Sequence, residues 1–454
     1  MTTRRLMGLL LAGLLTPGCS LVLDAGRHQG GTPADAGPGG MDAGPQTDAA
    51  GTDAGVPGDG SVDGGIECSI DSDCPGGGFL RCIGGTCESC ELTRGGAPEM
   101  LIGNVLGDGK ISLTVLDPTG SNPTLMLGTI RDNGMGGPIL ATISTRSVLS
   151  GGGPTDIDAT PAGDFIPGSI GLRAINETDA AVVVTRTPGM RVTPEPQVAV
   201  GTFRGTFTPI TLDPFGNVLT IPGRAIASGS GGGVRLVWQE STTAPMTALN
   251  FGSVLPGAAP ADYTSGSLGT VDGTRELVGS DGDIVVLEGD GSSLVTWDAS
   301  SSGNPDTLDT PDRTTRPALA ARYDGTYLLV WASGVNLNVD RMSCSGSSCG
   351  MGMEHVADTP MMASLPTATT FDGVPIVALF DLISANVSVT ALGQAVDLGR
   401  FGSALQAGTD QPTDLQVVAY MRAGVPTVVV AESASAGAMG APYNVYLHEF
   451  ACSP

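Results

Sequence analysis

Short apolar runs separated by turn residues dominate the chain from about Thr93 to its end at Pro454. The runs are rich in Val, Ile and Leu, and Gly, Pro, Asp and Asn stand between them. No stretch of useful length shows the apolar spacing of an amphipathic helix. This pattern is typical of β-strands joined by tight turns, and it predicts an all-β fold.

A longer unit repeats within this region. Its clearest copy runs from Pro317 to Trp331, with a further strand at Val335–Val339. A second copy spans Pro366–Phe380, a third begins at Pro412, and looser copies lie upstream. The main strands fall near residues 139, 182, 235, 284, 327, 376 and 427, at spacings of 43 to 53 residues.

This period fits the blades of a β-propeller better than the strands of a sandwich. A propeller blade is a four-stranded sheet, and known propeller repeats have periods of about 40–50 residues. A sandwich places about seven short strands within about 100 residues. The repeats therefore predict a β-propeller of seven blades over residues 92–454. An extra hairpin, Met100–Val105 with Ile111–Leu116, leaves eight blades open.

The N-terminal segment has a different pattern. Arg4 and Arg5 precede an apolar run, Leu6–Leu15, and small residues lead from there to Cys19. This order is the layout of a secretory signal. The run is shorter than the about 20 residues that a membrane-spanning helix needs.

Gly18 directly before Cys19 resembles the lipobox of bacterial lipoproteins. The resemblance implies a signal peptide at 1–18, cleavage between Gly18 and Cys19, and lipid on the Cys19 thiol. Ser20 after the cysteine implies transport to the outer membrane of a Gram-negative-type envelope. The alternative is an ordinary signal peptide cut nearby, with Cys19 discarded or paired.

Residues 19–66 form the predicted lipid anchor and a tether rich in Asp, Ala, Gly and Pro. Asp-Ala-Gly recurs at Asp24, Asp35, Asp42 and Asp53. Such a segment buries too little apolar surface to offset the entropy of ordering it, so we expect it to be disordered. No pair of carboxylates recurs there at the spacing of a calcium loop.

The net charge of the whole chain, −25, argues against a nucleic-acid partner.

Nine cysteines in an exported chain indicate disulfides. With Cys19 lipidated, eight remain, and five of them form a predicted cysteine-rich module at residues 67–91: Cys68, Cys74, Cys82, Cys87 and Cys90. Zinc is disfavoured there, because no second C-x-x-C or His pair accompanies Cys87-x-x-Cys90.

Locality narrows the connectivity of these cysteines. Cys344 and Cys349 most simply close their own loop. One cysteine of the module then pairs with Cys452, and Cys90 lies nearest to the following domain. We therefore predict Cys90–Cys452, which would clamp the first and last segments of the body, and leave the pairing within 68–87 open.

The candidate chemistry of the body is sparse. Asp-Gly at Asp281, Asp324 and Asp372 predicts tight turns, because Asp-Gly supplies the positive φ of a type I′ turn. The acidic run Ser280–Asp283, with Glu288 and Asp290, is a possible acid pair or calcium site. Asp281 and Asp283 are its weak metal candidates, but turn acids are favoured.

Other candidate residues carry weaker signals. Gly346-x-Ser348-x-Gly350 matches a hydrolase motif but lacks the strand-to-helix context that the motif needs. His355 and His448 lie far apart in the sequence. Tryptophans close three apolar runs and are assigned to packing: Trp238, Trp297 and Trp331.

The sequence thus predicts an exported lipoprotein whose propeller binds or scaffolds without catalysis or cofactor. Its expected partners are the membrane, through the lipid, and an unidentified envelope protein or glycan. One alternative is a propeller glycoside hydrolase or other carbohydrate-active enzyme, and another is a structural envelope protein. Carboxylates that converge within about 5–10 Å in the propeller channel would favour hydrolysis, and a lining of Thr, Ser and Gly would favour binding or structure.

Overall fold

The computed structural model describes residues 67–453 outside a set of turns and loops. The excluded segments are 107–108, 133–138, 150–152, 160–164, 189–196, 204–206, 215–225, 231–232, 242–245, 255–263, 273–276, 282–283, 289–292, 299–305, 310–316, 346–347, 350–353, 394–395, 409 and 436–441. Strand residues at 165–169, 183, 185–188, 197–309, 344–345 and 348–349 are described by backbone alone. The chain divides into units 1–59 and 60–454. The predicted signal peptide, Cys19 and tether lie outside the described residues.

The described chain is all β, apart from one 3-10 helix, η1 (Asp71–Asp73). Five four-stranded sheets follow one another along the chain, and the strands of each sheet lie side by side in the order of the sequence. Their strands are β9 (Phe165–Ala174), β10 (Ala180–Pro188), β11 (Gln197–Phe203) and β12 (Phe207–Pro214); β13 (Ile226–Ser230), β14 (Gly233–Ser241), β15 (Met246–Val254) and β16 (Thr264–Asp272); β17 (Leu277–Asp281), β18 (Ile284–Glu288), β19 (Ser293–Asp298) and β20 (Asp306–Asp309); β21 (Ala318–Ala321), β22 (Tyr327–Ser333), β23 (Asn336–Met342) and β26 (Glu354–Pro360); and β27 (Ala363–Phe371), β28 (Val374–Asp381), β29 (Asn386–Ala391) and β30 (Gly402–Leu405). Each sheet is an antiparallel meander.

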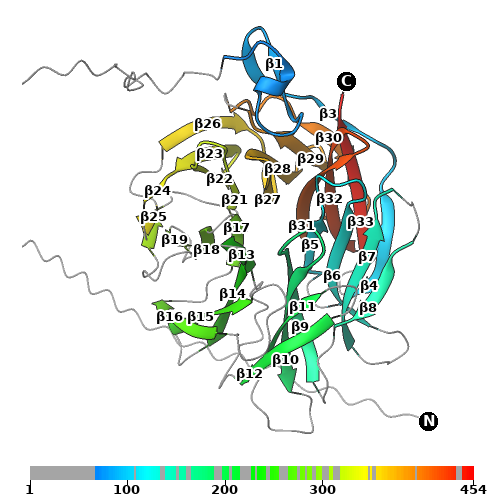
Figure 1. The fold of residues 1–454 in the computed structure, drawn as a ribbon, viewed down its shortest axis with the longest axis vertical. Helices are drawn as coiled ribbons and strands as arrows, with labels where there is room; N and C mark the ends of the chain where they lie inside the picture. Colours follow the sequence, from blue (N-terminus) through cyan, green and yellow to red (C-terminus); the bar gives the residue numbers. More distant parts are fainter. Residues whose placement is uncertain are drawn as a thin grey trace, which may run out of the picture. The chain divides into compact units, whose positions relative to one another are not determined.

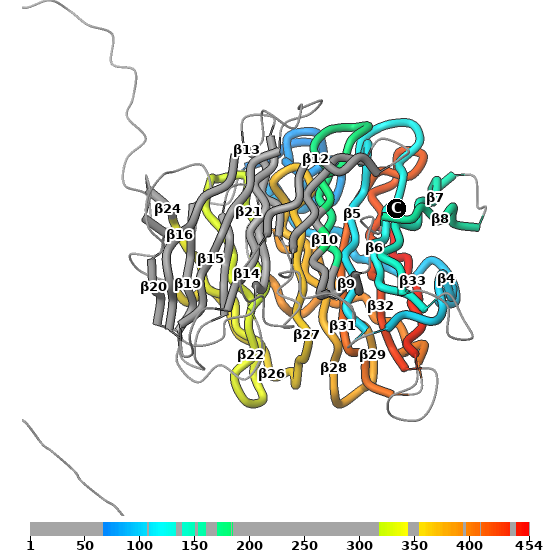
Figure 2. The backbone as a smooth tube through the Cα atoms, turned by 90° about the horizontal axis from the view of Figure 1, so that it is seen from below, coloured from blue at the N-terminus to red at the C-terminus, as the bar shows by residue number. Residues whose placement is uncertain are grey.

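A nine-stranded sheet contains two further groups of strands. Its members are β3 (Leu92–Arg94), β4 (Glu99–Val105), β5 (Ile111–Leu116), β6 (Thr124–Asp132), β7 (Ile139–Ser147), β8 (Thr155–Asp158), β31 (Asp414–Arg422), β32 (Val425–Ser435) and β33 (Tyr443–Cys452). β5 to β8 form one group, and β31 to β33 with β3 and β4 form the other. The only register pair between β4 and β6 is Val105 with Arg131, which joins the two groups. Figure 2 shows β33, β32 and β31 lying beside β4 and β6.

The first strands of these groups contact one another in sequence order. β5 contacts β9, and the contacts continue through β13, β17, β21 and β27 to β31. β31 in turn contacts β5, so the series of contacts returns to its starting strand (Figure 1). The repeated sheets are therefore linked through their first strands.

Two details of the strand assignment correct the prediction. Residue 139 lies in β7, the third strand of its group, whereas the other six main-strand positions lie in second strands. Met100–Val105 does not form a hairpin with Ile111–Leu116, because β4 pairs with β33 and β5 pairs with β6. The open edge of β33 offers unpaired backbone groups, and β4 satisfies them while it buries Ile102 and Val105.

The N-terminal end of the body thus runs along the C-terminal strand. β3 pairs with the end of β33, where Leu92 is the register partner of Cys452. β4 pairs with an earlier part of β33, where Glu99 is the register partner of Leu447. The disulfide Cys90–Cys452, with Cα atoms 5.5 Å apart, fastens this pairing at its end. This is the bond that the sequence predicts.

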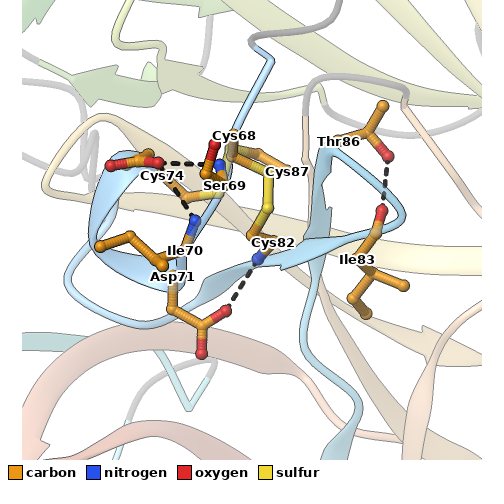
Figure 3. The surroundings of a disulfide bond; sticks show 10 residues. Cys68, Ser69, Ile70, Asp71, Cys74, Cys82, Ile83, Thr86 and Cys87 are labelled. Atoms are coloured by element: carbon orange, nitrogen blue, oxygen red, sulfur yellow. Dashed lines mark hydrogen bonds between the residues drawn. A yellow bond between two sulfur atoms is a disulfide. The ribbon is translucent and has the colours of Figure 1, made fainter.

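The cysteine-rich module contains β1 (Leu80–Ile83) and β2 (Thr86–Ser89). The disulfides Cys68–Cys82 and Cys74–Cys87 close it (Figure 3). Asp71 holds the fold locally, because its carboxylate accepts a 2.9 Å hydrogen bond from the Cys82 amide. Cys68, Cys74 and Cys87 offer ligand atoms within 4.8 Å of one another. All three are disulfide-bonded, so they have no thiolates for a metal.

The module packs against the body through an apolar contact. Phe79 is fully buried and meets Phe371 edge to face, with ring centroids 5.4 Å apart. Gly76, at φ +94°, lies so close that an added Cβ would stand 2.1 Å from Val374 Cγ2. Glycine therefore permits both the backbone shape and the close approach.

Among the described residues, no helix has the length and apolarity to cross a membrane.

Candidate functional site

A cavity of about 430 Å³ lies between five of the first strands: β5, β9, β21, β27 and β31. We call it the first-strand cavity. Its described polar lining is dominated by hydroxyl groups and consists of Ser112, Thr114, Thr119, Arg173, Thr367, Thr369, Thr370, Asp372 and Gln416. Strand alternation accounts for part of this lining, because Ser112 and Thr114, like Thr367 and Thr369, are two residues apart and point to the same side of their strands.

Part of this hydroxyl lining joins one sheet to the next. The Ser112 hydroxyl accepts a 2.9 Å hydrogen bond from the Leu172 amide, and the Thr114 hydroxyl accepts one of 3.1 Å from the Ala174 amide. Both bonds run from β9 to β5. The Thr370 hydroxyl donates to the Ala321 carbonyl at 2.9 Å, between β27 and β21. These side chains therefore stabilise the contacts between first strands as well as lining the cavity.

The described lining contains one carboxylate, Asp372, and one cation, Arg173. Glycoside hydrolysis generally needs two carboxyl groups about 5–10 Å apart. Asp372 occupies a tight turn, with φ 48° for Asp372 and 76° for Gly373. Two positive φ values are the mark of a type I′ turn, so the turn predicted at Asp372 is confirmed.

The turn at Asp324 is built differently from the prediction. Only Gly325 has a positive φ, and the Arg322 amide donates across the loop to the Thr326 carbonyl. The Asp324 carboxylate accepts hydrogen bonds from the Thr326 amide at 3.0 Å and hydroxyl at 2.6 Å. Burial alone would raise the pKa of Asp324. The bonds from Thr326 and the charge of Arg322 outweigh it, so the pKa lies below its ordinary value.

The acidic run near Asp281 is only partly described. Asp281 is the last residue of β17 and pairs in register with Ile284, so it ends a strand. Asp283 and Asp290 lie outside the described residues, and the side chains of Asp281 and Glu288 are not described. The weak metal candidates Asp281 and Asp283 therefore stay predictions.

His355 takes part in a polar cluster that the sequence did not reveal. Asp340, only 5% exposed, accepts a 2.7 Å hydrogen bond from the Trp331 indole and lies 3.0 Å from His355 Nδ1. Trp331 is 6% exposed, which confirms its packing role. The sequence signal that could have revealed this cluster was the Gly334 turn, because this turn sets the register between β22 and β23. It places Asn338 opposite Trp331, with Asp340 next on that face.

His448 lies in a different sheet and is fully enclosed. Its Nε2 is 2.5 Å from Glu432 Oε2, and both side chains have zero exposed area. Glu432 also accepts the Ala407 amide at 3.1 Å. His448 Nδ1 has no hydrogen-bond partner in the structure. Glu432 was missed because it interrupts an apolar run, where a surface position would have been the simpler expectation.

The Gly346-x-Ser348-x-Gly350 motif falls on a short hairpin. β24 (Cys344–Ser345) pairs with β25 (Ser348–Cys349), and Cys344 is the register partner of Cys349. Side chains are not described here, so the predicted Cys344–Cys349 bond stays a prediction. Within the described residues no helix follows Ser348, in line with the absence of the context that the hydrolase motif requires.

Comparisons with known proteins give no family for this chain. No family model matches it, and no curated protein matches it. A solved structure of a mitotic checkpoint complex aligns over 79% of this chain and 93% of its own, at 10% identity and a TM-score of 0.45. A mutant NanB sialidase from Streptococcus pneumoniae aligns over 81% and 71%, at 9% identity and a TM-score of 0.39. Prolyl oligopeptidase B from Galerina marginata aligns over 74% and 47%, at 11% identity and a TM-score of 0.38.

Proposed function

We propose that the chain is a non-catalytic binding or scaffolding β-propeller of seven blades. The five four-stranded sheets and the two groups of the nine-stranded sheet supply seven units. The cyclic series of contacts between first strands supports a closed arrangement of these units. β3 and β4 complete the last unit, a way to close a propeller without an open edge.

One observation carries the binding function: the described lining of the first-strand cavity is rich in hydroxyls and holds a single carboxylate. Uncharged hydroxyl and amide groups recognise a ligand through many modest hydrogen bonds. A glycan or the polar loop of an envelope protein presents matching groups. We assign the ligand to one of these two classes.

The proposed location is the outer membrane, with the body held by lipid on Cys19 and a tether at residues 20–66. Three disulfides support an oxidising compartment. The Gly18–Cys19 sequence supports the lipid. Mass spectrometry of the mature N-terminus tests it directly, and Cys19→Ser should abolish labelled palmitate incorporation. An unlipidated wild-type N-terminus would overturn the anchor.

The ligand test is a screen of the oxidised full chain against a glycan array and against envelope extracts. Thr369→Val and Gln416→Leu keep the size of two lining side chains while removing polar groups, and both should weaken the binding that is found. Thr145→Val is the matched control, since β7 does not line this cavity. Equal weakening by the control would contradict the site.

Turnover of a glycan, lost in Asp283→Ala, Glu288→Ala or Asp372→Asn, would overturn the non-catalytic function in favour of the hydrolase. Binding without turnover supports the proposal.

A further inference from the structure

A second cavity, of about 180 Å³, lies where the last group of strands meets the first. We call it the seam pocket. Its lining comes from the 95–99 segment, from β6 and β7 of the first group, and from β31, β32 and β33 of the last. It shares no lining residue with the first-strand cavity. A ligand in the seam pocket would therefore be independent of the function proposed for the first-strand cavity.

Two ion pairs line the seam pocket. Arg146 donates to Glu99 at 2.7 Å, and Arg422 donates to Glu449. A guanidinium has five N–H groups. Among the described residues, each of these arginines has only the one bonded partner named here. The pocket therefore has no net charge, yet it presents spare donors beside carboxylate acceptors.

Tyr420 adds an unused hydroxyl. The residue is 1% exposed, and no described residue hydrogen-bonds to its hydroxyl. Burial raises the pKa of Tyr420, Glu449 raises it further, and Arg422 and Arg146 oppose the rise. The hydroxyl is therefore protonated near neutral pH and lies within electrostatic reach of these charges. A ligand that hydrogen-bonds to this hydroxyl would gain a net contribution of about 1 kcal/mol.

One wall of the pocket is aliphatic. It consists of Leu125, Val148, Val429 and Leu447, which belong to a buried apolar cluster beneath the charged residues. The pocket therefore combines an apolar surface with charges of both signs. Its volume is about six times the roughly 30 Å³ share of a water molecule in the liquid, which is room for a small molecule.

We infer that the seam pocket binds a small aliphatic zwitterion with the chemistry of a free α-amino acid. The ligand's carboxylate lies against the spare N–H groups of Arg146 and Arg422. Its ammonium group lies against Glu99 and Glu449, and its aliphatic side chain lies on the apolar wall. Charge-assisted hydrogen bonds of this kind are about twice as strong as neutral ones.

Calorimetric titration of the oxidised full chain with three probes tests this inference. Leucine carries both charges, N-acetylleucine only the carboxylate, and leucinamide only the ammonium. Leucine should bind at least about 10-fold more tightly than either derivative, because each derivative lacks one of the two charged groups that the pocket's arginines and glutamates would bind. No heat with leucine up to about 10 mM, a range covering weak millimolar binding, would overturn the inference. Equal affinity for a blocked derivative would also overturn it and indicate recognition of a peptide terminus.

Variants locate the binding. Tyr420→Phe should weaken leucine binding about 3- to 10-fold, and Arg422→Gln about 10- to 100-fold. Arg341→Gln is the matched control, because Arg341 pairs with Glu354 at 3.5 Å away from the pocket. Leucine binding should not change in this control. Equal loss in the control and in Arg422→Gln would contradict the assignment of the pocket. A thermal unfolding scan of each variant verifies that it is folded.

Discussion

Two joins between strands of the body differ in how they are held. At the join between β5 and β9, the chain runs directly from one group to the next, and two side-chain hydroxyls bond to backbone amides. The second join lies inside the last group, where β33 meets β3 and β4 from the other end of the body. There β3 and β4 pair along β33, and Cys90–Cys452 adds a covalent link.

This difference shows what chain connectivity supplies in a repeated β fold. Neighbours linked by a short loop lose little further entropy when they meet, so modest hydrogen bonds suffice. Strands that lie hundreds of residues apart in the chain, as β3 and β4 do from β33, meet at a larger entropic cost. The structure offsets that cost with a backbone ladder and a bond that constrains the unfolded chain.

Removal of the covalent link has the largest expected effect on this contrast. Cys90→Ser with Cys452→Ser opens a loop of 362 residues. The chain-entropy argument predicts a loss of about 6 kcal/mol in the free energy of unfolding. Urea unfolding measures it. The control is Cys68→Ser with Cys82→Ser, which opens a loop of only 14 residues and should cost about 3 kcal/mol. Equal losses would show that loop length does not govern the join.

The second largest effect is expected for the buried Glu432–His448 pair in the last group. Glu432→Ala leaves the enclosed His448 without its partner, and we expect a loss of about 3–5 kcal/mol in unfolding free energy. Glu354→Ala, which breaks the more exposed pair with Arg341, should cost about 0–1 kcal/mol. Thermal and urea unfolding compare the two. Similar losses would contradict the structural importance of the buried pair.

The hydrogen bonds of Ser112 and Thr114 between β5 and β9 should contribute less to stability than the disulfide or the Glu432–His448 pair. Ser112→Ala and Thr114→Val each remove one bond between β5 and β9 and should cost about 1 kcal/mol. Hydrogen exchange should accelerate at the Leu172 and Ala174 amides, which lose their acceptors. The bond from the Thr145 hydroxyl to the Thr155 carbonyl is exposed, so Thr145→Val should change neither quantity. Unchanged exchange at Leu172 in Ser112→Ala would rule out the bond.

The smallest effect concerns a turn within one sheet and its dependence on pH. The pKa of Asp324 lies below its ordinary value of 3.8 in the folded chain. Its stabilisation is therefore complete above that value and is lost as pH falls through the lower folded pKa. Solvent screens this partly exposed group, so we expect less than about 1 kcal/mol. Urea titrations between about pH 2 and 5 should show a shallower loss in Asp324→Asn. Identical slopes would contradict the role of Asp324.

The comparison also shows which features a sequence reveals. Cys90–Cys452 was predictable, because cysteine parity and position leave few choices. The position of the strand near residue 139 within its group was not predictable. β6 and β7 are similarly apolar, and the repeat period does not show which strand of a group is the second. The predicted hairpin between Met100–Val105 and Ile111–Leu116 was wrong for another reason. β4 pairs with β33, which is far away in the sequence, and not with β5, which follows it directly.

The candidate sites depended still more on the fold. Strand alternation accounts for the pairs Ser112–Thr114 and Thr367–Thr369 in the first-strand cavity, but only once the first strands are known. The seam pocket draws Arg146 and Glu449 from opposite ends of the body, so no local motif contains it. Asp340 and His355 meet only because the β23–β26 register places them side by side.

The pairing of β3 and β4 with β33 also sets an order of events during synthesis. Residues 92–105 emerge early, but their partner strand, Tyr443–Cys452, is made more than three hundred residues later. The early segment must wait, unpaired, through more than three hundred residues of elongation, since Cys90 and Cys452 are 362 positions apart. Completion of the fold is thereby coupled to the synthesis of β33, and a chain truncated before β33 would leave β3 and β4 with an exposed edge.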